Sequence, residues 1–256
     1  MSIVLHIPHA SKHIPNEYIK YFTVSKKDLQ FELLKMTDHF TDELFDVSGD
    51  NIHQIKFPIS RLLVDVERFE TDELEPMFKV GMGCIYEKTH DGKSLKLVKD
   101  IKDELINKFY KTHHKNFTKI IDKKLKENNK VLIIDCHSFP KHPLPYELNQ
   151  EVDRPEICIG TDNFHTSEKL KNSLGEVFKD LNFTLKYNEP FNGSIVPVKF
   201  YNKDKIVQSV MIEVRRDLYM DEKSGEKNSK FYYIKNILKG ILLKISVWFV
   251  YILEWI

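Results

Sequence analysis

Two histidines and one glutamate stand at the ends of apolar, strand-like segments. His9 follows residues 3–7, His137 follows residues 131–135, and Glu213 lies within a third such segment. A buried acid is costly unless it is paired or takes part in chemistry. Zinc binds histidine nitrogen and carboxylate oxygen and keeps one position for water. These residues therefore indicate a hydrolytic zinc site, although solvated or capping histidines remain the alternative that the residues alone leave open.

Two arginines flank a short apolar segment. Arg61 and Arg68 stand on either side of residues 62–66. Because a guanidinium group binds a carboxylate through two hydrogen bonds, one arginine could hold a substrate carboxylate. The other could face a developing oxyanion. A structural ion pair with Asp65 or Glu67 is the alternative. The chain has no HExxH motif, EF-hand loop, GxGxxG motif or Walker loop.

These residues need a scaffold in which strands alternate with helices. Apolar runs predict strands at residues 3–7, 52–55, 62–66, 131–135, 157–160, 183–187 and 209–214. Helical periodicity appears at residues 27–45, 94–127, 168–181 and 230–251. The alternation predicts an α/β domain with a mainly parallel or mixed sheet, whose ligands bind at the carboxyl ends of the strands. No linker or repeat divides the chain, so we expect one domain over residues 1–256.

Composition limits the function classes. Of 256 residues, 41% are hydrophobic, and 39 basic residues against 38 acidic ones give a net charge of +1. This balance offers no electrostatic case for nucleic acid as a partner. Cys84, Cys136 and Cys158 form no CxxC motif and are odd in number. They are expected to be buried, reduced thiols in a cytoplasmic protein.

The C-terminal end is unusually apolar. Residues 245–256 carry one charge, and the apolar helix is expected over 236–256. A membrane-spanning helix needs about 20 apolar residues, which this tail does not reach. We expect a docked terminal helix. Membrane contact through the tail and an oligomer interface are the alternatives, and the sequence does not give the oligomeric state.

Six segments, in this order along the chain, resemble the N-formylglutamate amidohydrolase family, which belongs with the zinc carboxypeptidases and aspartoacylases. They are Ile7-Pro8-His9-Ala10-Ser11, Thr37-Asp38-His39-Phe40-Thr41-Asp42, Ser60-Arg61-Leu62-Leu63-Val64-Asp65-Val66-Glu67-Arg68, Asp135-Cys136-His137-Ser138, Asn188-Glu189-Pro190-Phe191-Asn192-Gly193 and Ile212-Glu213-Val214-Arg215-Arg216. The segments span almost the whole chain.

The resemblance implies a fold and a site. The fold is a three-layer α/β domain of the phosphorylase/hydrolase-like, zinc exopeptidase-like type, with a central mixed sheet and helices on both faces. The site holds one catalytic Zn²⁺. His9 and His137 match the metal-binding histidines, and Glu213 matches the general base and acid. Arg61 matches the arginine on the oxyanion side, and Arg68 matches the arginine that holds a substrate carboxylate.

The first departure from the wider group concerns the third metal ligand. Carboxypeptidases carry a glutamate three residues after the first histidine, but this chain has Lys12 there. A charged lysine does not bind zinc, so we expect the carboxylate to come from Asp38. Asp42 and His39 are weaker candidates, and a helix cap is the alternative role for Asp38.

The second departure concerns the substrate site. Relatives in the aspartoacylase branch carry asparagine where this chain has Glu67, which could neutralise Arg68 and weaken an anionic subsite. His114 fits a helix histidine that the family often shows, with a surface histidine as the alternative. Asn192 and Gly193 could shape the substrate pocket, or form a plain turn.

The function expected from these residues is zinc-dependent hydrolysis of the amide bond of an N-acyl amino acid, a small-molecule substrate. The alternative within hydrolases is a carboxypeptidase or amidase that acts on a peptide or cell-wall fragment. A non-catalytic binding protein that retains the fold is the alternative from another class.

Overall fold

A six-stranded sheet forms the centre of the computed structural model, which describes residues 2–252. The strand order is β2-β1-β3-β6-β4-β5. The first four strands of this order are mutually parallel, whereas β4 runs antiparallel to β6 and parallel to β5. The strands are β1 Ser2–Ile7, β2 Ile52–Lys56, β3 Val131–Phe139, β4 Ile157–Thr161, β5 Leu185–Tyr187 and β6 Val207–Arg215. The expected mixed sheet is confirmed.

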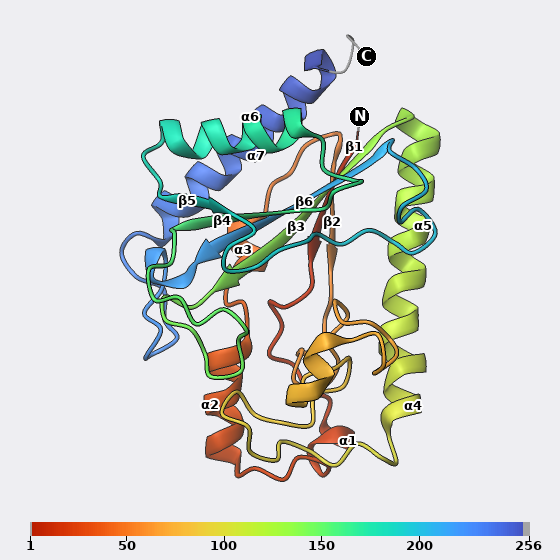
Figure 1. Cartoon of the computed structure of the whole chain (residues 1–256), viewed down its shortest axis with the longest axis vertical. Coiled ribbons are helices and arrows are strands. Elements are labelled where there is room, and N and C mark those ends of the chain that lie inside the picture. Colours follow the sequence, from red (N-terminus) through yellow and green to blue (C-terminus); the bar gives the residue numbers. More distant parts are fainter. Residues whose placement is uncertain (1, 253–256) are drawn as a thin grey trace.

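Helices cover both faces of this sheet (Figure 1). The helices are α1 Asn16–Ile19, α2 Lys26–Met36, α3 Thr41–Leu44, η1 Pro76–Val80, α4 Lys102–Leu105, η2 Ile106–Tyr110, α5 Lys111–Asn128, α6 Glu168–Asp180, η3 Arg216–Leu218 and α7 Phe231–Ile252. Side chains of α6 and α7 pack on one face of the sheet in one hydrophobic cluster. Side chains of α5 pack on the opposite face in another. The three-layer α/β architecture is therefore as expected.

The two faces of the sheet are sorted by residue parity, because successive side chains of a strand point to opposite faces. In β3, Leu132 and Ile134 join the cluster under α6 and α7, while Val131 and Ile133 join the cluster under α5. The same alternation in β1 places Val4 on the α5 face. Polar residues in register with these α5-facing positions must share that face.

A third hydrophobic cluster lies outside the sheet. It is built from residues between Ile14 and Tyr110, with Leu144 added, and it gathers α1, α2, η1 and the loops between them. In Figure 1 this part of the chain occupies the lower half of the molecule, beyond the carboxyl ends of the strands. We call it the lower lobe. It brings loop residues to the edge of the sheet where ligands bind in α/β proteins.

The strand expected at residues 62–66 is wrong. These residues form a turn in the lower lobe, since the amides of Leu63 and Val64 both donate to the carbonyl of Ser60. Once those amides are used locally, they cannot join a strand ladder.

The helix expected at residues 27–45 is interrupted, with α2 ending at Met36 and α3 starting at Thr41. In between, the Asp38 amide donates to the His9 carbonyl and Phe40 adopts a positive φ of 63°. This break turns Asp38 towards the loop that follows β1.

The helix expected at residues 94–127 begins only at Lys102. Upstream, the amides of Leu95 and Leu97 donate to the carbonyls of Glu87 and Tyr21, which holds this stretch in the lower lobe. The helix expected at 168–181 is confirmed, and its start is capped by Ser167, which accepts a hydrogen bond from the Leu170 amide.

The C-terminal helix docks on the sheet over its described side chains. Phe231, Leu238 and Ile245 of α7 are among those that pack in the cluster shared with α6. Residues 253–256 of the expected tail lie outside the described residues. None of the helices within residues 2–252 combines the length and apolar character that a membrane crossing requires. The three cysteines are buried and unpaired, as expected.

Candidate metal centre and active site

Four polar side chains project from the α5 face of the sheet. They are His6 of β1, Asp135 and His137 of β3, and Glu213 of β6, and all four are buried. The parallel register pairs His6 with Asp135 and His137 with Glu213. Because paired residues in neighbouring strands point the same way, the sheet itself brings the four groups together.

His9 leaves one of its ring nitrogens without a hydrogen bond. The ring is 2% exposed, and its Nε2 lies 2.8 Å from Asp65 Oδ1. Its Nδ1 has no hydrogen-bond partner among residues 2–252, and it lies 3.7 Å from Asp38 Oδ2. A buried polar atom without a partner is costly. The His9 Nδ1 lone pair is thus free to bind a metal ion, with Asp65 fixing the ring.

His137 lies between carboxylates on both sides of its ring. Nδ1 is 3.0 Å from Asp38 Oδ2, while Nε2 is 2.9 Å from Glu67 Oε2 and 3.1 Å from Asp135 Oδ1. Neither Nε2 contact has the alignment of a hydrogen bond, so Nε2 counts as unpartnered within the described chain. Burial acts to lower the pKa of His137, but the charges of Glu67 and Asp135 hold it well above its usual range.

Asp38 joins the two histidines to an arginine. Its Oδ1 accepts a hydrogen bond from the Arg216 guanidinium at 3.0 Å. Burial acts to raise the pKa of the Asp38 carboxyl, but the hydrogen bond with His137 and the nearby His9 hold it well below its usual range. Asp38 is therefore a carboxylate that faces both histidines.

The donor groups fit a divalent cation. His9, Glu67 and His137 each offer one ligand atom, and these three atoms lie within 4.8 Å of one another. Asp38 approaches the same two histidines through Oδ2. Histidine nitrogen with carboxylate oxygen is a donor set that zinc accepts. Two sets of possible metal ligands therefore share His9 and His137. One set adds the carboxylate of Glu67, and the other adds that of Asp38.

Glu213 is buried beside this group. Its Oε2 has no hydrogen-bond partner within residues 2–252. Burial raises the pKa of its carboxyl to about 8, and the neighbouring charge of His137 opposes this rise. A carboxyl group that titrates near neutral pH is suited to accept and return a proton.

The two arginines of the short segment behave differently. Arg61 binds Asp65 Oδ2 through Nε at 3.3 Å and through the terminal nitrogen at 2.8 Å, and it reaches to within 3.8 Å of Asp38. Arg68 lies 3.7 Å from the same Asp65 atom and 3.9 Å from Glu75, and its Nε lacks a hydrogen bond within the described residues. The ion pair with Asp65, the alternative role for these arginines, is present for both, although Nε of Arg68 makes no hydrogen bond within the described residues.

Glu67 does not pair with Arg68, although the sequence raised that concern. Among residues 2–252, the ion-pair partners of Glu67 are His6 and His137. Burial acts to raise the pKa of Glu67, but the charge of His137 and the close contacts with both histidines hold it well below its usual range. The carboxylate therefore belongs to the histidine cluster.

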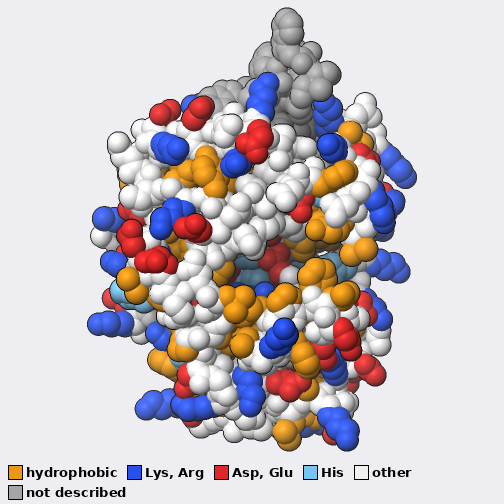
Figure 2. Space-filling view, in the orientation of Figure 1, with side chains coloured by type: hydrophobic (Ala, Val, Ile, Leu, Met, Phe, Trp, Pro, Cys, Tyr) orange, Lys and Arg blue, Asp and Glu red, His pale blue; other side chains and the backbone are white. Residues whose placement is uncertain are grey.

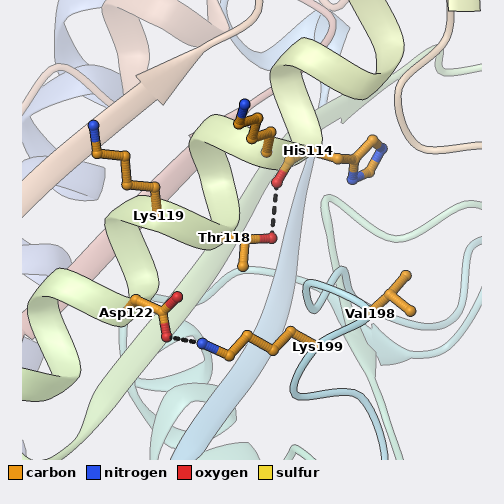
Figure 3. A pocket seen from close by; sticks show the side chains of 7 residues that line it. His114, Thr118, Lys119, Asp122, Val198 and Lys199 are labelled. Carbon is orange, nitrogen blue, oxygen red and sulfur yellow. Dashed lines mark hydrogen bonds and ion pairs between the residues drawn. The ribbon is translucent and has the colours of Figure 1, made fainter. Parts of the chain in front are cut away.

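The remaining sequence-derived candidates lie around the cluster. His114 Nε2 is 2.8 Å from the Val66 carbonyl oxygen, and His114 lines a surface hollow of about 490 Å³ between α5 and Lys199 (Figure 3). Neither His137 nor Glu213 lines this hollow. Figure 2 shows histidine and acidic side chains at the bottom of a second hollow near the centre of the displayed face.

The loop with Asn192 and Gly193 packs beside β4. Asn192 is exposed, and Gly193 has a φ of 89°, a conformation that favours glycine. The loop reaches the cluster further along, where the Ile195 amide donates to Asp135 Oδ2 at 3.2 Å.

Sequence reasoning assigned no role to His6, Asp135 or Arg216 and treated Asp65 only as a partner of the arginines. A usable signal existed for two of them. His6 and Asp135 are polar residues inside otherwise apolar strands, and Asp135 has the same parity as His137. Arg216 gave no such signal, because its contact with Asp38 spans 178 residues of the chain.

The mixed sheet, the buried histidine–carboxylate cluster at its carboxyl ends and the adjacent buried glutamate define an α/β protein with a site of the hydrolytic type. The sequence profile of one family, described as N-formylglutamate amidohydrolase, matches residues 1–220. The chain belongs to the N-formylglutamate amidohydrolase family. It is therefore an amidohydrolase.

Solved structures agree with this fold. The crystal structure of N-formylglutamate amidohydrolase from Ralstonia eutropha JMP134 superimposes with a TM-score of 0.83 at 20% identity, over 97% of this chain and 94% of that one. A gene product from Agrobacterium tumefaciens gives a TM-score of 0.61 at 18% identity, over 96% and 92% of the two chains. No curated protein matches the sequence.

Proposed function

We propose that this protein is a zinc-dependent hydrolase that cleaves the amide bond of an N-acyl amino acid. The observation that carries the proposal is the unpartnered Nδ1 of buried His9, which lies beside Asp38 and His137 with the Glu213 carboxyl next to them. In our proposal the protein is cytoplasmic, which its three buried, unpaired cysteines support.

His9, Asp38 and His137 are the proposed metal ligands. Asp38 Oδ2 approaches the Nδ1 atom of both histidines, at 3.7 and 3.0 Å, so one ion could bind all three groups. Glu67 faces the opposite nitrogen of His137 and forms no ion pair with His9 among the described residues. Glu67 is the carboxylate that forms, with both histidines, a group of ligand atoms within 4.8 Å of one another. We nevertheless propose Asp38 as the third ligand, because it lies on the side where His9 Nδ1 is unpartnered among the described residues.

When bound, zinc lowers the pKa of a water molecule and polarises a carbonyl group. Glu213 would accept the proton of the attacking water and pass it to the leaving nitrogen, which its pKa of about 8 supports. Arg61, held by Asp65, would face the oxyanion.

Substrate binding is assigned to residues around this centre. Arg68 would hold the substrate carboxylate, and its free Nε supports this role. His114, Asn192 and Gly193 are proposed to border the substrate site. The acyl group of the substrate is left open by these contacts.

Metal analysis tests the ligand assignment. We expect Asp38→Asn to lose tightly bound zinc, while Glu213→Gln retains it. Loss of zinc from the Glu213 variant, or full retention by the Asp38 variant, contradicts the assignment. A wild-type protein that neither contains zinc nor binds added zinc would instead indicate a non-catalytic binding protein.

Substrate specificity is tested with formyl-, acetyl- and peptidyl-amino acids. We expect turnover of a simple N-acyl amino acid with a free carboxylate, and a rise in KM with a smaller change in kcat for Arg68→Lys. Preference for peptidyl substrates would favour a carboxypeptidase or amidase.

A further inference from the structure

The side of His137 that faces away from Asp38 carries a second group of metal-ligand atoms. His6, Glu67 and Asp135 each offer one ligand atom within 4.8 Å of one another. The Nε2 atom of His137 also points into this group. We call these four residues the deep cluster.

We propose that the deep cluster binds a second divalent transition-metal ion, separate from the proposed catalytic zinc, with His137 bridging the two ions as an imidazolate whose ring proton is released to solvent. The inference rests on the proposed function only in that the other nitrogen of His137 is assigned to the first ion. The ligands of the second ion are His6 Nδ1, His137 Nε2 and the carboxylates of Glu67 and Asp135.

The distances within the deep cluster match the edges of a coordination sphere. His6 Nδ1 lies 2.9 Å from Asp135 Oδ1 and 3.2 Å from Glu67 Oε1. His137 Nε2 lies 2.9 Å from Glu67 and 3.1 Å from Asp135. Ligands placed about 2.0–2.2 Å from one ion are separated by roughly 2.9–3.5 Å. These four histidine–carboxylate distances therefore lie within the range that a shared cation produces.

Hydrogen bonding leaves part of the deep cluster unsatisfied. His137 is 4% exposed, and its Nε2 makes no hydrogen bond within residues 2–252 despite two carboxylate oxygens close by. Glu67 Oε1 is likewise unpartnered. Unpartnered buried atoms that converge on one point are costly, and a cation at that point would satisfy them.

The charge of the deep cluster also calls for a cation. Asp38 and Asp65 both contact arginines. In contrast, the ion pairs of Glu67 and Asp135 within the described chain involve only His6 and His137. In the metal-free chain, only the two histidines offset the buried Asp135 carboxylate and the partly buried Glu67 carboxylate. A dication would neutralise both.

Supporting contacts hold the proposed ligands in place. His6 Nε2 lies 2.9 Å from His113 Nε2, and the His6 ring stacks on Phe117 at 4.8 Å. Asp135 Oδ2 accepts a hydrogen bond from the Ile195 amide. Such outer contacts orient ligands and are typical of metal sites in proteins.

Zinc titration of the metal-free protein tests the proposal. We expect the wild type to bind two equivalents and Glu67→Gln to bind one, with the proposed catalytic ion retained. Glu32→Gln is the matched control, because Glu32, His90 and Asp91 form another group of ligand atoms on the lower lobe. This variant should keep both equivalents. A second equivalent that disappears with Glu32→Gln rather than Glu67→Gln overturns the proposal.

Two further outcomes separate this proposal from the catalytic one. In the first outcome, the wild type binds one equivalent of zinc, Asp38→Asn loses it and Glu67→Gln keeps it. This result overturns the proposal of a second ion and agrees with the proposed function. No binding at all overturns both. Because Glu67→Gln could unfold the cluster, anomalous scattering from zinc-loaded wild-type crystals is the independent measurement. One metal peak on each side of His137 supports the proposal, and a single peak on the Asp38 side refutes it.

Discussion

Replacing Glu213 with glutamine separates the chemistry of this carboxyl group from its cost to folding. Burial raises its pKa from 4.5 to about 8 in the folded, metal-free chain. Between these values the folded state binds a proton that the unfolded state has released, so stability falls as the pH rises. Glutamine has nearly the same shape and no charge. The variant should therefore escape this loss of stability.

The size of the effect follows from the pKa values. At pH 5 the unfolded carboxyl is largely ionised already, and each further pH unit costs about 1.4 kcal/mol until the folded group ionises near pH 8. From pH 5 to pH 7 the wild type should thus lose roughly 2–3 kcal/mol that the variant keeps. For a chain of this length, this corresponds to a difference in Tm of about 5–10 °C.

The assay is thermal unfolding of both proteins with a chelator, at pH 5 and at pH 7. Exposed Glu226 provides a control, since Glu226→Gln should unfold like the wild type at both pH values. With zinc restored, Glu213→Gln should lose about 10²–10⁴-fold in kcat, as expected for a lost general base. A Tm difference that is the same at both pH values, or near-normal turnover, would refute the reasoning.

Three other predictions test separate features. Asp65→Asn should weaken zinc binding about 10–100-fold, measured by chelator competition, because Asp65 orients His9; unchanged affinity would argue against this role. Burial lowers the pKa of Lys96 to about 7, so wild-type stability should rise by about 1.4 kcal/mol per pH unit between pH 7 and 9, and Lys96→Met should remove this rise in denaturant unfolding. Gly160→Ala should lower the free energy of unfolding by about 1–3 kcal/mol, because the added Cβ would collide with the Gly193 carbonyl oxygen. Gly240→Ala, with open space around it, should be neutral or stabilising by up to about 1 kcal/mol. Similar effects of the two substitutions in denaturant unfolding would contradict the contact argument.

The sheet and two strand-end residues were predictable because they depend on local patterns. Apolar runs of strand length identified the strands of the parallel core, and the rule on carboxyl ends placed His137 and Glu213 at one edge. The register between β3 and β6 then pairs these two residues directly. Here the periodicity of the sequence and the tertiary structure agree.

The lower lobe could not be predicted in the same way, because long-range hydrogen bonds override its local patterns. Residues 62–66 have the composition of a strand, yet the amides of Leu63 and Val64 donate to the adjacent Ser60 carbonyl, and the Asp65 amide donates to the distant Cys84 carbonyl. The break between α2 and α3 directs Asp38 towards His9. It depends on a hydrogen bond from the Asp38 amide to the His9 carbonyl, and these two residues are 29 positions apart in the sequence. The orientation of Glu67 towards His6 and His137, rather than Arg68, likewise arises from the assembled fold.

The pairing of His137 with Glu213 in neighbouring strands also limits how this protein can change in length. Deleting or inserting one residue within β6 would still allow a full ladder of backbone hydrogen bonds, but it would turn Glu213 to the α7 side of the sheet. In variants that keep activity, insertions and deletions should therefore be confined to the loops of the lower lobe and the turns between strands. The strand interiors should tolerate substitution of their apolar residues far better than a change in their residue count.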